Sequence, residues 1–366
     1  MINILIIAVF LVLVTYVFQV SRWRKAWVNE QEWTSRAKAD IGLTVIIPFK
    51  DEEQHVKQLL NSLKLQSYTN WELLLVNDQS KDMGVEIAMQ YLGDFPVPIK
   101  VLNSPGQGKK MALLHGVEQA STDCIITSDA DCYFHPDWLK TMAGYQSETN
   151  ADLVIGPVGI AVHTGWLERF QSIDFAGLQL SGAAAAFRGQ SIMCNGANLL
   201  CKRALYRQAK VQPHIASGDD MFLLEWMKQK GHSVNFLKAK EAIVQTKPMA
   251  CISQFLMQRA RWASKAPAYR DWHIWFSALL VSGLVFLMFS TFVAGFWQWQ
   301  MFMICGSILI IKSISDYTLL KAGQAFYTYP LRFTIVVVIQ AVYPLYVLSV
   351  LLFPLFKKLT WKGRHI

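Results

Sequence analysis

The chain has 366 residues, enough for one large domain together with membrane segments. Hydrophobic residues make up 53% of it and charged residues only 17%, which excludes an ordinary soluble domain. The net charge of +9 would suit nucleic acid, but many basic residues lie beside apolar segments. Attraction to anionic lipid headgroups explains the charge more simply, so we expect membrane lipids and no nucleic acid as partners.

The N-terminal segment predicts a membrane helix. Residues 2–20 carry no charge and are long enough for one span. No basic region precedes this run and no small-residue cleavage site follows it, which disfavours a cleaved signal peptide. Arg22, Arg24 and Lys25 come directly after it. We therefore expect residues 1–21 to be a retained transmembrane anchor with its basic flank in the cytoplasm.

The composition becomes that of a soluble domain from residue 41 to residue 245, where strand-like and helix-like runs alternate. The expected strands are residues 43–47, which stop at Pro48, and residues 72–76, 99–102 and 124–128. The expected helices are residues 51–65, 110–119 and 221–230. This alternation predicts βαβ units and an α/β domain with a mostly parallel sheet.

Acidic residues follow three of these strands. They lie in the segments 48–53, 77–78 and 129–131. Ligands of open α/β sheets bind outside the carboxyl ends of the strands, so we expect the three segments to converge. In Asp129-Ala130-Asp131, two carboxylates one residue apart suit Mg²⁺ or Mn²⁺, which takes one or two carboxylates plus phosphate oxygens. The alternative for this motif is a solvated turn.

Three other residues near the strand ends allow both a functional and a structural interpretation. Asp78 is placed to contact a base or ribose, or else forms an ordinary Asx turn. Glu52 lies at a helix start, where the helix dipole alone explains an acid. Residues 106–109 match neither a dinucleotide fingerprint nor a P-loop, but a glycine turn presenting Lys109 to a phosphate fits them.

Asp220 is a candidate general base. It precedes the helix expected at residues 221–230, where a carboxylate can remove a proton from an acceptor hydroxyl. The structural alternative is a capping box formed by Ser217 and Asp220.

A second group of candidates lies on a helix in residues 246–272. Gln258, Arg261 and Trp262 fall on one face, where arginine suits phosphate and tryptophan suits a sugar ring. The alternative is an amphipathic helix lying on the membrane, with Phe255 and Trp262 inserted and Arg259 and Arg261 on headgroups.

About three membrane segments are expected in residues 273–356. The charge-free run 274–311 is too long for one span, so we expect two spans with a turn at residues 297–300, and a third span in 333–356. Three spans after the domain would put the C-terminus outside. The tail, residues 357–366, is however basic and prefers the cytoplasm, so either one segment is re-entrant or interfacial, or the short tail crosses.

The six cysteines show no CxxC pair and no zinc spacing. Cys132 and His135 lack two further ligands nearby. We expect free thiols in a reducing compartment.

The ordered set of motifs resembles the membrane-integrated branch of the family 2 inverting glycosyltransferases, which have the GT-A fold. That branch holds the cellulose, chitin, hyaluronan and poly-N-acetylglucosamine synthases and the ceramide glucosyltransferases. The matching segments are residues 45–53, 76–80, 108–113, 129–131, 218–220 and 258–262. The resemblance therefore implies a Rossmann-like GT-A domain between N- and C-terminal transmembrane helices.

The resemblance also implies roles for individual residues. The donor side would comprise Pro48, Glu52, Asp78, Lys109, Asp129, Gln258, Arg261 and Trp262. Asp131 with Asp129 would hold a divalent metal, Mg²⁺ or Mn²⁺, and Asp220 would be the catalytic base. Cys194, Asn195, Gly196 and Trp262 would lie on the acceptor side.

The expected activity is inverting transfer of a hexose or N-acetylhexosamine from a nucleotide-diphosphate sugar, uridine-linked by expectation, to a lipid-linked or glycan acceptor. The expected location is a bacterial inner membrane, with the domain in the cytoplasm. A processive synthase and a non-catalytic nucleotide-sugar sensor stay open as alternatives. Asn77 and Gly218-Asp219 depart from the pattern of processive members, which weakens the first alternative.

Overall fold

The computed structural model describes residues 2–34, 39–161, 165–209, 218–362 and 364–365. The chain forms two compact units. The helical unit comprises residues 1–30, 162–192 and 248–359, and the sheet unit comprises residues 31–161, 193–247 and 360–366. Compared with the expected domain 41–245, the sheet unit also includes residues 31–40, 246–247 and the last residues of the tail, whereas residues 162–192 belong to the helical unit.

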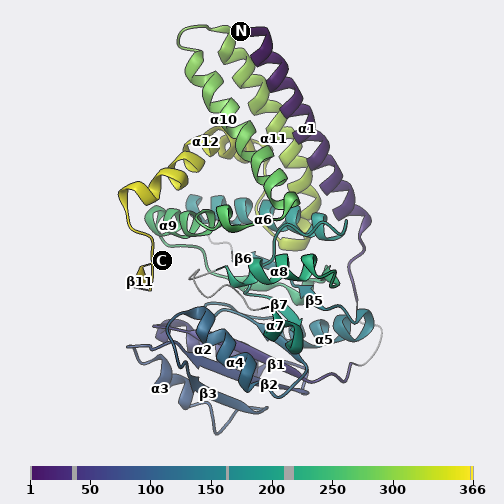
Figure 1. Ribbon diagram of the computed structural model, residues 1–366, viewed down its shortest axis with the longest axis vertical. Helices are drawn as coiled ribbons and strands as arrows, with labels where there is room; N and C mark the ends of the chain where they lie inside the picture. The colour runs from purple at the N-terminus through teal and green to yellow at the C-terminus, as the bar shows by residue number, and fades with distance from the viewer. Residues whose placement is uncertain (1, 35–38, 162–164, 210–217, 363, 366) are drawn as a thin grey trace. The chain divides into compact units, whose positions relative to one another are not determined.

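The sheet unit is built on a seven-stranded sheet with the order β3-β2-β1-β4-β7-β5-β8 (Figure 1). Its strands are β1 (Leu43–Phe49), β2 (Trp71–Asn77), β3 (Ile99–Asn103), β4 (Cys124–Thr127), β5 (Leu153–Ile155), β7 (Leu199–Lys202) and β8 (Val234–Phe236). Within it β7 alone runs antiparallel, against β4 and β5. Two short pairs stand apart, the parallel pair β6 (Val158–Ile160) and β9 (Val244–Thr246) and the antiparallel pair β10 (Thr360–Trp361) and β11 (Arg364–His365). The expected mostly parallel α/β sheet is confirmed.

The first strand is longer than expected, because it continues through Pro48 to Phe49. Pro48 pairs with Val76 of β2. On the other side β1 pairs with β4 only as far as Ile46. The N–H group that proline lacks therefore costs no ladder hydrogen bond on that side, and the strand can carry the chain to the sheet edge.

The helices of the sheet unit are α2 (Glu53–Lys64), α3 (Gly84–Met89), α4 (Lys109–Gln119), α5 (Trp138–Thr149), α7 (Arg203–Gln208) and α8 (Asp219–Gln229). The first of them begins two residues later than expected, because Asp51 has φ 49° and is not helical. α4 packs on β1 and β2 at Gly116, where an added Cβ would lie 2.4 Å from a methyl carbon of Ile46. Glycine here lets the helix approach the sheet closely.

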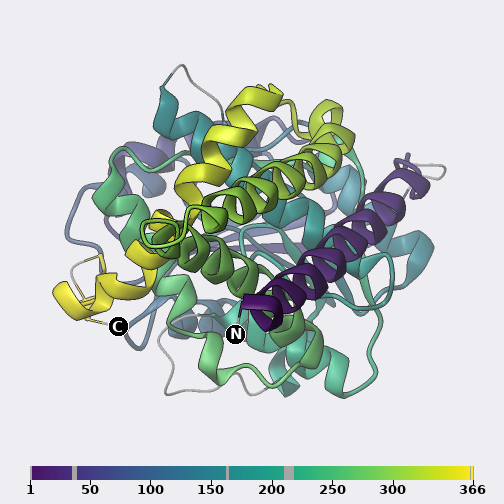
Figure 2. The same ribbon diagram turned by 90° about the horizontal axis from the view of Figure 1, so that it is seen from above.

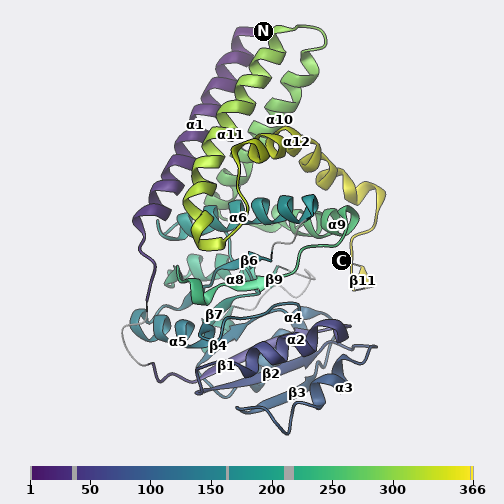
Figure 3. The ribbon, with the colours of Figure 1, turned by 180° about the vertical axis from the view of Figure 1, so that it is seen from behind.

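The helical unit contains α1 (Ile2–Asn29), α6 (Trp166–Ala186), α9 (Ile252–Ala263), α10 (Trp272–Ala294), α11 (Gln300–Tyr327) and α12 (Phe333–Phe356). Four of these, α1, α10, α11 and α12, are long and apolar enough to cross a membrane. α10 and α11 are joined by residues 295–299, which confirms the expected turn. Figure 3 shows α1 beside α11, and Figure 2 gives the view from above.

Two helices extend beyond their expected membrane segments. α1 continues through its basic flank to Asn29, because the buried Trp27 packs on Phe326 of α11 at 5.2 Å between ring centroids. α11 continues past residue 311 and carries a buried ion pair, Lys312 Nζ to Asp316 Oδ2 at 2.6 Å. Charges among apolar helices persist only when paired, so the pair explains why a charged stretch stays in this helix.

Candidate active site

The acidic motif Asp129-Ala130-Asp131 follows β4 directly. Lys109, the first residue of α4, forms an ion pair with Oδ1 of Asp129. Asp131 Oδ2 accepts a hydrogen bond from Thr246 Oγ1 at 3.4 Å, at the end of β9. The two neighbouring carboxylates therefore differ in their partners. Asp129 is paired with the ammonium group of Lys109, and Asp131 is bound by the hydroxyl group of Thr246.

The electrostatic surroundings of Asp131 suit a bound cation. Burial raises the pKa of its carboxyl, and the negative charges of Asp129 and Glu52 raise it further. Among the described residues no group of three or more histidine, cysteine, aspartate or glutamate side chains is arranged to hold a metal. A divalent cation at Asp131 would thus complete its shell with phosphate oxygens and water, as Mg²⁺ commonly does.

We expect replacement of Asp131 with asparagine to stabilise the metal-free protein at neutral pH. The folded pKa of Asp131 lies above that of the unfolded chain, so its stability contribution is present below the unfolded value and is lost as pH rises through the folded pKa. Thermal unfolding with a chelator should give the variant the higher midpoint at pH 7, and the gap should narrow toward acid pH. The exposed Asp123→Asn serves as control. An equal or lower midpoint at pH 7 would contradict the raised pKa of Asp131 in the folded protein.

Asp78 is held at the end of β2 by two backbone contacts. Its side chain is 1% exposed, and Oδ1 accepts from the Gly108 N–H at 2.9 Å. Gly108 has φ 99°, a conformation that glycine adopts readily and that turns this N–H group toward the carboxylate. The Asp78 N–H donates to the Phe49 carbonyl at 2.8 Å. The ends of β1 and β2 and the loop before α4 therefore meet at Asp78.

Glu52 lies in the loop after β1, as the N-terminal cap residue of α2. Its Oε2 is 2.6 Å from Nδ1 of His55. Because its charge raises the pKa of Asp131, Glu52 lies close enough to the motif after β4 to act on it. The acids that follow β1 and β4 thus lie near one another, and Pro48 is the second-last residue of β1.

Asp220 lies in the first turn of α8 and binds the loop that precedes β7. Its Oδ2 accepts from the Gly196 N–H at 3.0 Å. The same loop is fixed to the end of β4, because Thr127 Oγ1 donates to the Gly196 carbonyl at 2.9 Å and Ser128 Oγ donates to the Ala197 carbonyl at 2.7 Å. The candidate base and the acidic motif are therefore connected through one loop.

Lys109 joins the two groups electrostatically. Burial lowers the pKa of its ammonium, but nearby carboxylates outweigh burial and the net shift is upward. These carboxylates are Asp129, Asp220 and Asp219. Lys109 therefore lies among the acids that follow β4 and those that begin α8.

Asn198, the last residue of the loop 194–198, is fully buried and anchors this loop by hydrogen bonds. The Asn198 amide donates to the carbonyls of Pro157 and Ala242, each at 2.8 Å, and its Oδ1 accepts from the Trp138 indole at 3.1 Å. Asn195 Oδ1 accepts from the Ala197 N–H at 3.0 Å. Cys194 is buried, and burial followed by the charge of Asp220 holds the pKa of its thiol well above the ordinary value. An inert thiol suits a structural part of the loop.

The start of α8 differs from expectation. The helix begins at Asp219 rather than at residue 221, after Gly218 with φ 92°. Ser217 lies outside the described residues, so the capping box with Asp220 stays a prediction. The Asp220 carboxylate does accept from the N–H of the next residue, Met221, at 2.8 Å.

Gln258, Arg261 and Trp262 lie on α9 in the helical unit, so their approach to the donor stays a prediction. The interpretation that placed Arg259 on lipid headgroups is wrong. Arg259 is buried and binds Asp174 Oδ2 at 2.7 Å, with the ring of Trp262 centred 4.4 Å from its guanidinium carbon. An arginine that is buried, bonded to a buried carboxylate and covered by rings is not exposed to lipid headgroups.

Sequence reasoning missed two basic residues of the tail at the sheet. Arg364 NH1 binds Asp78 Oδ2 at 2.7 Å, and Lys362 Nζ binds Glu52 Oε1 at 2.8 Å. Basic residues after an apolar helix indicate membrane topology in the sequence, and no local pattern links them to acids that are distant in the chain.

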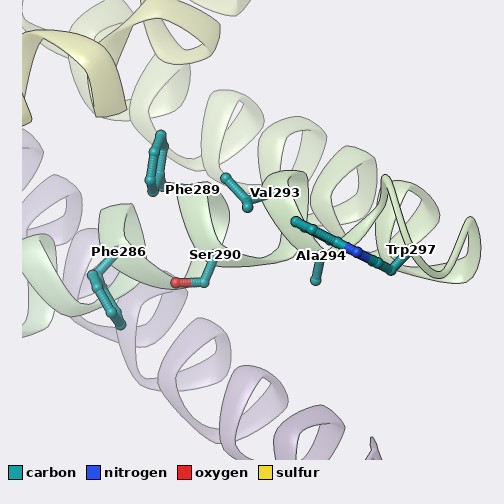
Figure 4. Close-up of a pocket in the computed structure, with 6 residues that line it drawn as sticks. All are labelled: Phe286, Phe289, Ser290, Val293, Ala294 and Trp297. Carbon is teal, nitrogen blue, oxygen red and sulfur yellow. The ribbon is translucent and has the colours of Figure 1, made fainter.

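An apolar hollow of about 370 Å³ lies on α10 of the helical unit (Figure 4). It is lined by Phe286, Phe289, Ser290, Val293, Ala294 and Trp297. None of the candidate site residues lines it, and its position on a membrane-type helix suits lipid chains.

Residues 44–211 match the family described as "Glycosyl transferase family 2". The chain contains a glycosyltransferase family 2 domain. The matched residues of this glycosyltransferase domain hold the acids after β1, β2 and β4 and the loop before β7, whereas Asp220 and α9 lie beyond them.

The domain is also similar to two curated relatives and to one solved structure. Glycosyltransferase AglE of Haloferax volcanii is 27% identical over 197 residues, 53% of this chain and 64% of the relative. Poly(ribitol-phosphate) beta-N-acetylglucosaminyltransferase TarS of Staphylococcus aureus is 29% identical over 116 residues, 31% of this chain and 20% of the relative. The chain thus spans less than two thirds of both relatives.

The solved structure is the mannosyltransferase PcManGT from Pyrobaculum calidifontis in complex with GDP-Man and Mn²⁺. It matches with a TM-score of 0.59 and 16% identity, covering 97% of each chain. At this identity the match shows the fold alone. The glycosyltransferase domain therefore has a GT-A-like fold, as the sequence resemblance implied, in a chain with four candidate transmembrane helices.

Proposed function

We propose that the protein is an inverting glycosyltransferase that moves a sugar from a nucleotide-diphosphate donor to an acceptor hydroxyl. One observation carries the proposal: the carboxylate of Asp220 and the pair Asp129 and Asp131 are linked through Lys109 and the loop containing Gly196. A single displacement needs a base for the acceptor and a charge-stabilising group for the leaving diphosphate, and this arrangement offers both.

The residues present fit a divalent metal, Mg²⁺ or Mn²⁺. Asp131 is a hard oxygen ligand whose pKa is raised first by burial and then by the negative charges of Asp129 and Glu52, which a bound cation would offset. When bound, the cation would offset the charge that develops on the departing diphosphate. The Mn²⁺ found with GDP-Man in the structurally similar mannosyltransferase supports this choice.

In the proposed reaction, Asp220 removes the proton of the acceptor hydroxyl. The acceptor oxygen forms a bond to the anomeric carbon while the bond from that carbon to the diphosphate oxygen breaks, so the configuration inverts. The proton passes to Asp220, and the electron pair of the broken bond leaves with the diphosphate. Lys109 adds positive charge beside Asp129, on the side of the leaving group.

The donor end is assigned to Asp78 and Glu52, with Pro48 before them and Gln258, Arg261 and Trp262 on α9. A buried carboxylate such as Asp78 accepts hydrogen bonds from a base N–H or a ribose hydroxyl. We propose a uridine-linked hexose or N-acetylhexosamine, and the partial similarity to TarS supports the second.

The acceptor is proposed to be lipid-linked or a glycan at the membrane, approaching along Cys194, Asn195 and Gly196 with Trp262. Four helices that are able to cross a membrane support this location. The proposed setting is the inner membrane of a bacterium, with the glycosyltransferase domain in the cytoplasm, where nucleotide-sugars are present.

A thermal-shift screen of nucleotide-diphosphate sugars with and without Mn²⁺ tests this function. We expect one donor family to raise the unfolding midpoint by several degrees with metal and by less without it, because ligands that bind only the folded state stabilise it by mass action. Transfer to lipid extracts then follows for the stabilising donor. No stabilisation by any donor, with or without metal, would contradict the proposal.

A further inference from the structure

The C-terminal hairpin β10–β11 belongs to the sheet unit, although it follows the last helix of the helical unit. Each of its two cations binds an acid of the candidate donor site. Arg364 NH1 lies 2.7 Å from Asp78 Oδ2, and Lys362 Nζ lies 2.8 Å from Glu52 Oε1. Each cation of the tail therefore binds a different acid, and the two acids lie in different loops. We would not expect this pairing from a solvated tail that contacts the sheet unit by chance.

Further hydrogen bonds accompany each ion pair. Arg364 NH2 also donates to the Asp78 carbonyl at 3.2 Å and to Gln79 Oε1 at 3.3 Å. Lys362 Nζ donates to the Asp51 carbonyl at 3.0 Å. The guanidinium thus holds both the side chain and the main chain at the end of β2, which fixes the position of the carboxylate.

The formal charge of the candidate site gives a reason why a nucleotide-diphosphate donor would need these contacts. The acids of the site are Glu52, Asp78, Asp129 and Asp131, with Lys109 among them. Four carboxylates and one ammonium carry a formal charge of −3, which repels an anionic nucleotide diphosphate. The two cations of the tail bring the charge to −1, and one divalent metal ion would then make it positive.

We propose that the tail is a working part of the donor site: Arg364 positions Asp78 for the nucleoside, and Lys362 with Arg364 neutralises the site for the diphosphate. Asp78 keeps lone pairs for the nucleoside, because a carboxylate offers about four acceptor positions and Gly108 and Arg364 each use one. This inference rests on the proposed function. Arg364 and Lys362 are positioning residues.

The test uses the full-length protein with Arg364→Ala and Lys362→Ala. Calorimetric titration with UDP and with GDP, each with Mn²⁺, gives the dissociation constant, and donor hydrolysis gives KM and kcat. We expect Arg364→Ala to raise the dissociation constant and KM about tenfold, which is one lost charged contact, and to leave kcat within about threefold. Arg364→Lys should recover part of the loss. Lys358→Ala removes an exposed basic residue nearby and should change neither value.

A double-mutant cycle separates positioning from general structural support. If Arg364 acts through Asp78, Arg364→Gln should add little to the loss caused by Asp78→Asn. Additive losses would overturn the positioning role, even if the single variants are destabilised. Donor affinity that is unchanged in Arg364→Ala would overturn the whole inference, and tighter binding would show that the tail competes with the donor.

The outcomes also separate this inference from the proposed function. A wild-type protein that binds neither nucleotide contradicts the proposed function and this inference with it. A wild-type protein that binds one of them, alongside tail variants that bind equally well, contradicts only the role of the tail.

Discussion

Replacing Asp220 with asparagine should lower the rate of sugar transfer by about 10²- to 10⁴-fold, the usual contribution of a positioned general base. Donor affinity should stay within about twofold, because the proposed role of Asp220 concerns the acceptor proton. The asparagine carbonyl can still accept from the Gly196 N–H, as Oδ2 of Asp220 does, so the loop keeps its support. Transfer rates under donor saturation and calorimetric titration of the nucleotide measure the two quantities.

Asp94→Asn is the matched control for Asp220, since it removes a carboxylate that is 91% exposed in the same unit. It should transfer sugar at the wild-type rate. If Asp220→Asn transfers as fast as the wild type, the base assignment is wrong. If it loses donor binding to the same degree as transfer, Asp220 belongs to the donor site instead.

Asp131→Ala should remove most metal-dependent activity, on the order of 10²- to 10³-fold, because a catalytic metal supplies several kcal/mol of charge stabilisation. Asp129→Ala should lose less, since Lys109 already occupies Oδ1 of Asp129. Mn²⁺ titrations of transfer rate measure the apparent metal affinity of each variant. The stabilising effect of Mn²⁺ with nucleotide in thermal unfolding gives a readout independent of turnover.

Asp123→Asn is the control here, because it changes an exposed carboxylate just before β4. Its metal dependence should match the wild type. A loss in Asp129→Ala as large as that in Asp131→Ala would mean that both carboxylates hold the cation and that Lys109 moves away when it binds. An Asp131→Ala enzyme with normal metal dependence would remove the metal site from this motif.

Much of the sheet and the strand-end acids could be predicted from local sequence. Buried apolar runs mark β1, β2 and β4, and a parallel sheet brings their carboxyl ends to one edge. The positions of Asp78 and Asp131 follow from that rule alone. The family resemblance added the loop with Gly196, and the structure joins this loop to Asp220 by a hydrogen bond.

Long-range contacts could not be predicted in this way. The pairing of Arg364 with Asp78 joins residues 286 positions apart, and nothing local in the sequence selects that partner. Arg259 likewise reads as a surface residue of an amphipathic helix, but its carboxylate partner, Asp174, lies on a different helix, α6. Such pairings depend on which elements pack together, which periodicity does not reveal.

The hairpin also ties the end of the chain to the sheet unit. Lys362 is bound to Glu52, and it lies six positions after Phe356, the last residue of α12. The two ion pairs therefore anchor the segment that follows the last membrane-type helix, so that the same residues which balance the charge of the acids also fix the C-terminus.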